Sequence, residues 1–135
     1  MKNIVVIAHD VKKPELVQFI NEHKDWIFGV NLIATGRTAE YLESQGIKVE
    51  HLSPGRSGGY SEITDRIKQN EIDIVIFLRD PLIKVGHHED IQALLEASNM
   101  YNIPLATNYA SAQLLILGYI KKEDYERRKS MDNEL

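Results

Sequence analysis

The sequence predicts a single-domain, doubly wound (Rossmann-like) α/β fold, with a mostly parallel five-stranded sheet flanked by helices. The first observation is that short runs rich in Val, Ile and Leu alternate with longer segments of helical period. The second is that most of these runs are apolar at consecutive positions, which is typical of strands buried on both faces. The third is that 135 residues with 43% hydrophobic content suffice for one core but leave no room for a second domain.

Five runs are predicted to be strands. They are NIVVIA (3–8), VNLIAT (30–35), IKVEHL (47–52), DIVIFL (73–78) and IPLAT (103–107). The third run alternates apolar and polar residues, so we predict that it lies at an edge of the sheet.

Apolar stripes at helical spacing predict helices between the strands. Three stripes are formed by Leu16, Ile20 and Ile27, by Ile63 and Ile67, and by Ile91, Leu94 and Leu95. A further helix is predicted from Ala110 to about Leu117. The tail KKEDYERRKSMDNEL has helix-forming residues but no apolar stripe, which predicts a short, frayed helix. We therefore expect an α/β domain over 1–120 and a charged C-terminal helix or tail over 121–135.

Composition excludes several classes of function. A formal net charge of −4 argues against a nucleic-acid-binding surface, which needs a cationic excess. The absence of cysteine excludes disulfides, thiolate nucleophiles and cysteine zinc sites, and it fits a reducing cytoplasm. No segment is apolar enough to span a bilayer, and the start MKNIVVIAHD does not resemble an export signal.

Polar clusters follow all five predicted strands. They are HD (9–10), TGRT (35–38), SPGRSGG (53–59), RDP (79–81) and TN (107–108). The carboxyl ends of parallel strands share one edge, which also receives helix N-termini that favour negative charge. The same loops carry several cations, namely Lys12, Lys13, Arg37, Arg56, Arg79 and Lys84. The sequence therefore predicts a site for a small anion at this edge.

Each cluster also has a structural interpretation that the sequence leaves open. In the structural interpretation, a Thr or Gly of TGRT caps a helix. Asp80 likewise caps an element that begins at Pro81. Taken alone, His9 and Asp10 fit a hydrogen-bonded buried histidine and a helix cap better than a site. The HHED segment (87–90) invites a metal-site reading, but neighbouring side chains diverge, so we predict no metal there.

The segment LSPGRSGGYSE (52–62) is the strongest single candidate for anion binding. Glycines such as Gly58 and Gly59 allow backbone N–H groups to converge on an oxyanion. Ser53 and Arg56 add hydroxyl and guanidinium donors.

Six motifs in order and spacing resemble the methylglyoxal synthase family over residues 3 to about 117. The motifs are IAHD followed by Lys13, ATGRT, LSP followed by the two glycines, IFLRDPL, the pair His87 and Asp90, and IPLATN. The resemblance implies a cytoplasmic lyase, usually a homohexamer, with a doubly wound fold. It implies conversion of dihydroxyacetone phosphate to methylglyoxal and inorganic phosphate without a metal or an organic cofactor.

The resemblance also implies roles for individual residues. His9 and Asp10 line the site, Asp80 follows the fourth strand as in the family, and His87 handles protons on the substrate oxygens with support from Asp90. The substrate phosphate is held by Lys13, Thr35, Thr38 and Ser53, to which the loop composition adds Arg56, Gly58 and Gly59.

Two departures from the family pattern lie in the loop. Tyr60 stands where the family has the aspartate proposed as the catalytic base, and a neutral phenol is a poor base at neutral pH. The loop reads Ser53-Pro54-Gly55 in place of Ser-Gly-Pro and has one extra residue before the two glycines. Asp10, Asp80, Asp90 and Glu62 remain open as alternative bases.

Two functions of different class follow. The first is a methylglyoxal synthase-type lyase, which His9, His87 and Asp90 favour. The second is a non-catalytic phosphate-sensing module of the same superfamily, which Tyr60 favours; the regulatory domain of carbamoyl phosphate synthetase resembles it. A receiver-type signalling domain is disfavoured, because Asp10 is a single acid where an acidic pair would be needed for a metal. The sequence favours the lyase.

Overall fold

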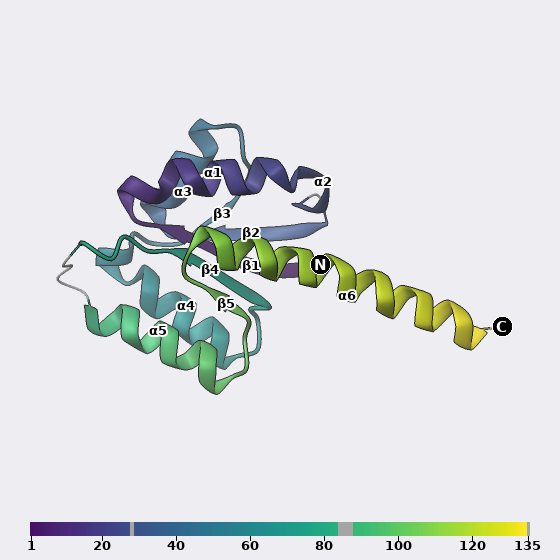
Figure 1. Ribbon diagram of the computed structural model, residues 1–135. Helices are drawn as coiled ribbons and strands as arrows, with labels where there is room; N and C mark the ends of the chain where they lie inside the picture. Colours follow the sequence, from purple (N-terminus) through teal and green to yellow (C-terminus); the bar gives the residue numbers. More distant parts are fainter. Residues whose placement is uncertain (28, 84–87, 135) are drawn as a thin grey trace.

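The computed structural model describes residues 1–27, 29–83 and 88–134. It is a five-stranded, all-parallel sheet with helices on both faces, which confirms the predicted fold class (Figure 1). None of the helices within the described residues has both the length and the apolar character to cross a membrane.

The five strands match the five predicted runs. They are β1 (Lys2–Ala8), β2 (Val30–Ala34), β3 (Glu50–His51), β4 (Ile74–Leu78) and β5 (Leu105–Ala106). Their order in the sheet is β3-β2-β1-β4-β5, so the run with alternating character lies at an edge, as predicted.

Six α-helices connect or follow the strands in the described residues. They are α1 (Lys13–Glu22), α2 (Lys24–Ile27), α3 (Gly36–Ser44), α4 (Gly59–Lys68), α5 (His88–Met100) and α6 (Tyr109–Glu134). Two 3-10 turns, η1 (Asp10–Lys12) and η2 (Gly55–Ser57), lie between β1 and α1 and between β3 and α4.

Two expectations about the helices were wrong. Ile27 does not share a helix with Leu16, because α1 ends at Glu22 and the backbone of the following residue, His23 (φ −120°, ψ 33°), leaves the helical conformation. The last helix does not end near Leu117 but continues to Glu134 and projects beyond the body of the molecule (Figure 1). The charged tail contains no Gly or Pro to stop it, and the Asp124–Arg128 ion pair (3.3 Å) joins successive turns.

The sheet separates two apolar layers. Helices α1, α3 and α6 cover one face of the sheet, and α4 and α5 cover the other (Figure 1). Ile4 and Val6 of β1 belong to the first apolar layer, whereas Val5 and Ile7 belong to the second. Successive residues of a strand point to opposite faces, so a strand buried on both sides must be apolar throughout. This requirement explains the continuous apolar runs in the sequence.

The topology places a crevice at the carboxyl end of β1. The chain moves from β1 outward to β2 and β3 on one side, then crosses to β4 and β5 on the other. In open α/β sheets such a switch point leaves a gap between the loops, and ligands bind there.

Candidate active site

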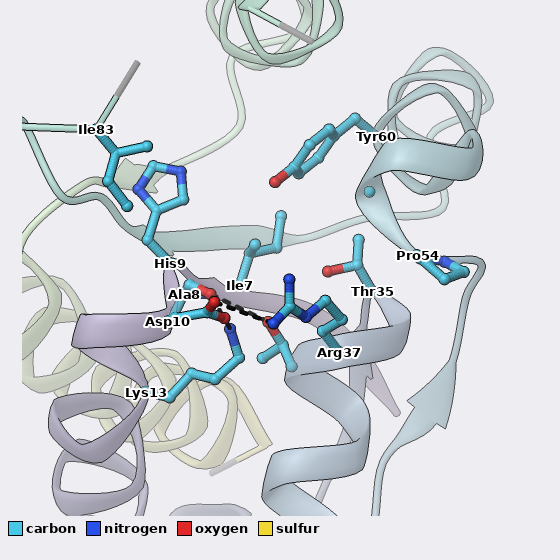
Figure 2. Close-up of a pocket in the computed structure, with 12 residues that line it drawn as sticks. Ile7, Ala8, His9, Asp10, Lys13, Thr35, Arg37, Pro54, Tyr60 and Ile83 are labelled. Atoms are coloured by element: carbon cyan, nitrogen blue, oxygen red, sulfur yellow. Dashed lines mark hydrogen bonds and ion pairs between the residues drawn. The ribbon is translucent and has the colours of Figure 1, made fainter. Parts of the chain in front are cut away.

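A cavity of about 130 Å³ lies at this switch point (Figure 2). It is lined by Ile7, Ala8, His9, Asp10, Lys13, Thr35, Arg37, Thr38, Pro54, Gly55, Tyr60 and Ile83. These residues come from the end of β1 through the start of α1, from the start of α3, from Pro54 through the start of α4, and from the segment after β4. The fold thus brings together three of the five polar segments that the sequence placed at strand ends, namely 9–10, 35–38 and 53–59.

Lys13 supplies a buried positive charge. Its side-chain amino group donates to the carbonyl oxygen of Ala8 (2.9 Å) and lies 2.7 Å from a carboxylate oxygen of Asp10. The residue is only 8% exposed, and an ammonium group has three N–H donors. The contacts described for Lys13 use two of them, which leaves the third for a ligand in the cavity.

Arg37 and Asp10 form an ion pair at the mouth of the cavity. A guanidinium nitrogen of Arg37 lies 3.0 Å from the second carboxylate oxygen of Asp10, and both side chains are more than half exposed (Figure 2). With Lys13, the described lining residues therefore carry two cations and one carboxylate. The resulting net positive charge favours an anion.

His9 is a neutral hydrogen-bond donor within this group. Its Nδ1 accepts the backbone N–H of Asp80 (2.7 Å), which places the proton of the neutral ring on Nε2. Burial lowers the pKa of His9, and the positive charge of Arg79 lowers it further. Nε2 is buried and has no hydrogen-bond partner among the described residues. An unsatisfied buried donor costs about 1–3 kcal/mol, which a ligand accepting this N–H would offset.

The N-terminus of α3 adds polar groups to the opposite wall. Thr35 precedes the helix, is 4% exposed, and its hydroxyl makes no capping bond to α3. Figure 2 shows this hydroxyl directed into the cavity. The hydroxyl of Thr38 instead lies 3.3 Å from both the N–H and the carbonyl oxygen of Ala8, so it fastens α3 to β1.

Gly58 and Gly59 determine the path of the glycine loop. Gly58 has φ +98°, which favours glycine, and a Cβ on Gly59 would stand 2.1 Å from the carbonyl oxygen of Ser53. The N–H of Ser53 donates to Glu62 (3.3 Å). Ser53, Gly58 and Gly59 are not among the lining residues, whereas Pro54 and Gly55 are. Arg56 lies in η2, but its side chain is outside the described part of the structure.

Tyr60 closes one side of the cavity. The residue is 6% exposed, and its ring stacks on Phe77 with centroids 5.7 Å apart and an interplanar angle of 18°. The Cε2 and Cζ atoms of the ring lie close to Gly55, where an added Cβ would stand 2.6 Å from both. Figure 2 shows the phenol oxygen pointing into the cavity. Packing thus fixes this hydroxyl in position.

The remaining predicted residues lie away from the cavity wall or outside the described residues. Asp80 supports His9 through its backbone, and its carboxylate accepts the N–H of Leu82 (3.0 Å). Asp90 lies in the first turn of α5, and neither aspartate lines the cavity. His87 falls outside the described residues.

Sequence reasoning gave no individual role to Arg37. It identified Arg37 only as one of six cations near this edge, without the ion pair to Asp10. Its role could have been predicted from its position, because Arg37 directly follows Thr35 and Gly36 and lies in the first turn of α3, beside the anion site.

Comparison with known proteins establishes the family. A model of the MGS-like domain matches residues 15–107. The methylglyoxal synthase of Thermoanaerobacterium thermosaccharolyticum is 45% identical over 117 residues, covering 86% of this chain and 87% of that protein. The chain belongs to the methylglyoxal synthase family.

Further members of the family agree in sequence and in structure. The methylglyoxal synthase of Caldicellulosiruptor saccharolyticus is 47% identical over 115 residues, which cover 84% of this chain and 82% of that protein. The crystal structure of methylglyoxal synthase from Elizabethkingia anophelis superimposes with a TM-score of 0.77 at 36% identity, covering 84% of this chain and 76% of that one. These findings confirm the resemblance that the six sequence motifs indicated.

Proposed function

We propose that the protein is a lyase that converts dihydroxyacetone phosphate to methylglyoxal and inorganic phosphate. Membership of the methylglyoxal synthase family supports this reaction class. The observation that carries the proposal is the unpartnered Nε2–H of His9 in a cavity that also holds the cations Lys13 and Arg37. A phosphate ester with a neighbouring carbonyl group has the two features that such a site recognises.

The phosphate of the substrate would bind at the cationic side of the cavity. Lys13, Arg37 and Thr35 supply an ammonium, a guanidinium and a hydroxyl group beside the N-terminus of α3. Arg56 remains a predicted fourth donor. Thr38, Ser53, Gly58 and Gly59 would contribute by holding Ala8 and the glycine loop in place.

The carbonyl group would lie against His9 and Tyr60. Removal of a proton next to the carbonyl leaves negative charge on its oxygen, and fixed donors stabilise that charge best in a site closed to water. The Nε2–H of His9 and the hydroxyl of Tyr60 are donors of this kind. Asp80 holds the His9 ring by its backbone N–H. His87, supported by Asp90, remains the predicted carrier of protons between substrate oxygens.

By the family resemblance, we expect the reaction to need no metal or organic cofactor. Dihydroxyacetone phosphate contains the same atoms as methylglyoxal and phosphoric acid together, so neither water nor a redox partner enters. The donors that hold the phosphate also assist its departure, since they stabilise charge on the leaving oxygens.

A second candidate function is phosphate sensing without catalysis. It is favoured by Tyr60, a buried phenol where the family resemblance places the base. Such a module would retain the anion site of Lys13 and Arg37 but would lack a group to remove the proton.

One experiment separates the two functions. The purified protein and a Tyr60→Asp variant are incubated with dihydroxyacetone phosphate, and methylglyoxal is followed over time. The lyase proposal predicts product from the natural protein. An inert natural protein together with an active Tyr60→Asp variant would establish the sensing function instead.

The same family resemblance leads us to propose a cytoplasmic homohexamer. The exposed apolar residues Leu114, Leu117 and Ile120 of α6 support burial against a further copy of the chain. Light scattering should then give a mass about six times the 15.4 kDa of one chain.

We also propose that the α/β domain ends near residue 120 and that a charged helical tail follows it. Ala112 and Ile116 pack in the core, whereas Tyr125 and Met131 are exposed.

A further inference from the structure

Asp10 is the single carboxylate among the described residues that line the cavity. We propose that Asp10 is the base that removes the substrate proton, and that binding of the substrate phosphate activates it. This inference rests on the proposed lyase function. It assigns the step for which Tyr60 is chemically unsuited.

In the unliganded cavity, Asp10 is held by cations on both oxygens. One oxygen lies 2.7 Å from the amino group of Lys13, and the other lies 3.0 Å from the guanidinium of Arg37. Neighbouring positive charge stabilises a carboxylate in its ionised form. In this arrangement Asp10 therefore has little tendency to accept a proton.

The substrate phosphate needs the same two cations. A phosphate group carries close to two negative charges at neutral pH and competes with a carboxylate for N–H donors. Its binding would draw Arg37 away from Asp10, engage the remaining N–H of Lys13, and bring negative charge close to the carboxylate. These changes make the carboxylate a stronger base. The base would thus become active when the substrate is in place.

The geometry allows Arg37 to make this exchange. Its side chain is 58% exposed and lines both the cavity and an adjoining open groove of about 460 Å³. Glu40 and Tyr41 line this groove but not the cavity. Lys13 is held by the carbonyl oxygen of Ala8, so it keeps its place while Arg37 changes partner. Asp10 is equally exposed and has room to turn toward a ligand.

The other carboxylates considered from the sequence are less suited. Asp80 caps the turn at Leu82, and Glu62 accepts the N–H of Ser53. Asp90 does not line the cavity.

The proposed steps balance in atoms and electrons. Asp10 takes a proton from the hydroxymethyl carbon, and the electron pair of that C–H bond forms an enediolate whose oxygen accepts the Nε2–H of His9. The hydroxyl group of that carbon then loses its proton, a carbonyl forms there, and the C–O bond to phosphate breaks with both electrons leaving on phosphate. The hydroxyl proton ends on phosphate. Asp10 returns its proton to the carbon that carried the phosphate, and this carbon becomes the methyl group of methylglyoxal.

The test compares Asp10→Asn with Glu40→Gln, a control with the same change of charge on a groove residue outside the cavity. We expect kcat with dihydroxyacetone phosphate to fall roughly 10³-fold in Asp10→Asn and to change less than about twofold in Glu40→Gln. Calorimetry with inorganic phosphate is the second readout. Asp10→Asn should bind phosphate about three- to tenfold more tightly, because the competing carboxylate is gone.

Three outcomes would overturn parts of the account, and they are distinguishable. An active natural protein whose Asp10→Asn variant keeps more than about a tenth of kcat would overturn Asp10 as the base. Unchanged or weaker phosphate binding by that variant would overturn the competition for cations. A natural protein that forms no methylglyoxal would overturn the proposed function itself, and the assignment of a base with it.

Discussion

The contact between Gly55 and the Tyr60 ring makes Gly55→Ala an informative change. A Cβ at position 55 would lie 2.6 Å from two ring carbons and 3.0 Å from the phenol oxygen, whereas ordinary contacts begin near 3.4 Å. The ring has little room to yield, because it is 6% exposed and stacks on Phe77. The added methyl group must therefore shift the glycine loop or turn the phenol away from the cavity.

Overpacking of this kind costs about 1–3 kcal/mol. For a domain of this length we expect a decrease in Tm of roughly 3–12 °C, measured by calorimetry. Gly118→Ala is the matched control, because no atom lies within 4 Å of a Cβ at that exposed position inside α6. There the same change should stabilise the helix by roughly 0.5–1 kcal/mol.

A double-mutant cycle isolates the contact from other effects of the substitution. Tyr60→Leu keeps an apolar side chain in the layer but removes the ring atoms that face Gly55. In that background Gly55→Ala should cost less than about 0.5 kcal/mol, giving a coupling of at least about 0.5 kcal/mol. An equal cost in both backgrounds would refute the placement of the ring against Gly55.

Two further predictions concern His9 and Lys13. Since the folded state lowers the pKa of His9, its contribution to stability is present above the ordinary value of 6.5 and is lost as the pH falls below it. The urea concentration at the midpoint of unfolding should therefore fall less between pH 7.5 and pH 5 in His9→Gln than in the natural protein. An equal fall in both proteins would contradict the burial of a neutral His9 ring. Lys13→Met should abolish most of the rise in Tm that phosphate produces in the natural protein, and an undiminished rise would place the anion elsewhere.

Much of the fold could be predicted from local patterns. The run NIVVIA had to be a central strand, since a strand apolar at successive positions requires cover on both faces. The break between Leu16 and Ile27 could not be predicted, because the apolar spacing continues through His23, whose backbone leaves the helix. The length of α6 was also missed, because charge without an apolar stripe does not distinguish a projecting helix from a frayed end.

The site could be predicted in outline because of topology. Parallel strands bring their carboxyl ends to one edge, so His9, Thr35 and Tyr60 had to lie near one another despite their separation in the chain. The pairing of Asp10 with Arg37 and the fixed position of Tyr60 depend on side-chain packing between elements. The sequence contains no local signal for such contacts. It left the base unassigned because Tyr60 stands in place of the expected aspartate.

The most direct test of the central claim is simultaneous measurement of methylglyoxal and inorganic phosphate released from dihydroxyacetone phosphate. The account predicts that the natural protein forms the two products in equal amounts. Absence of methylglyoxal under conditions where phosphate still raises the Tm would contradict catalysis and leave a cavity that only binds the anion.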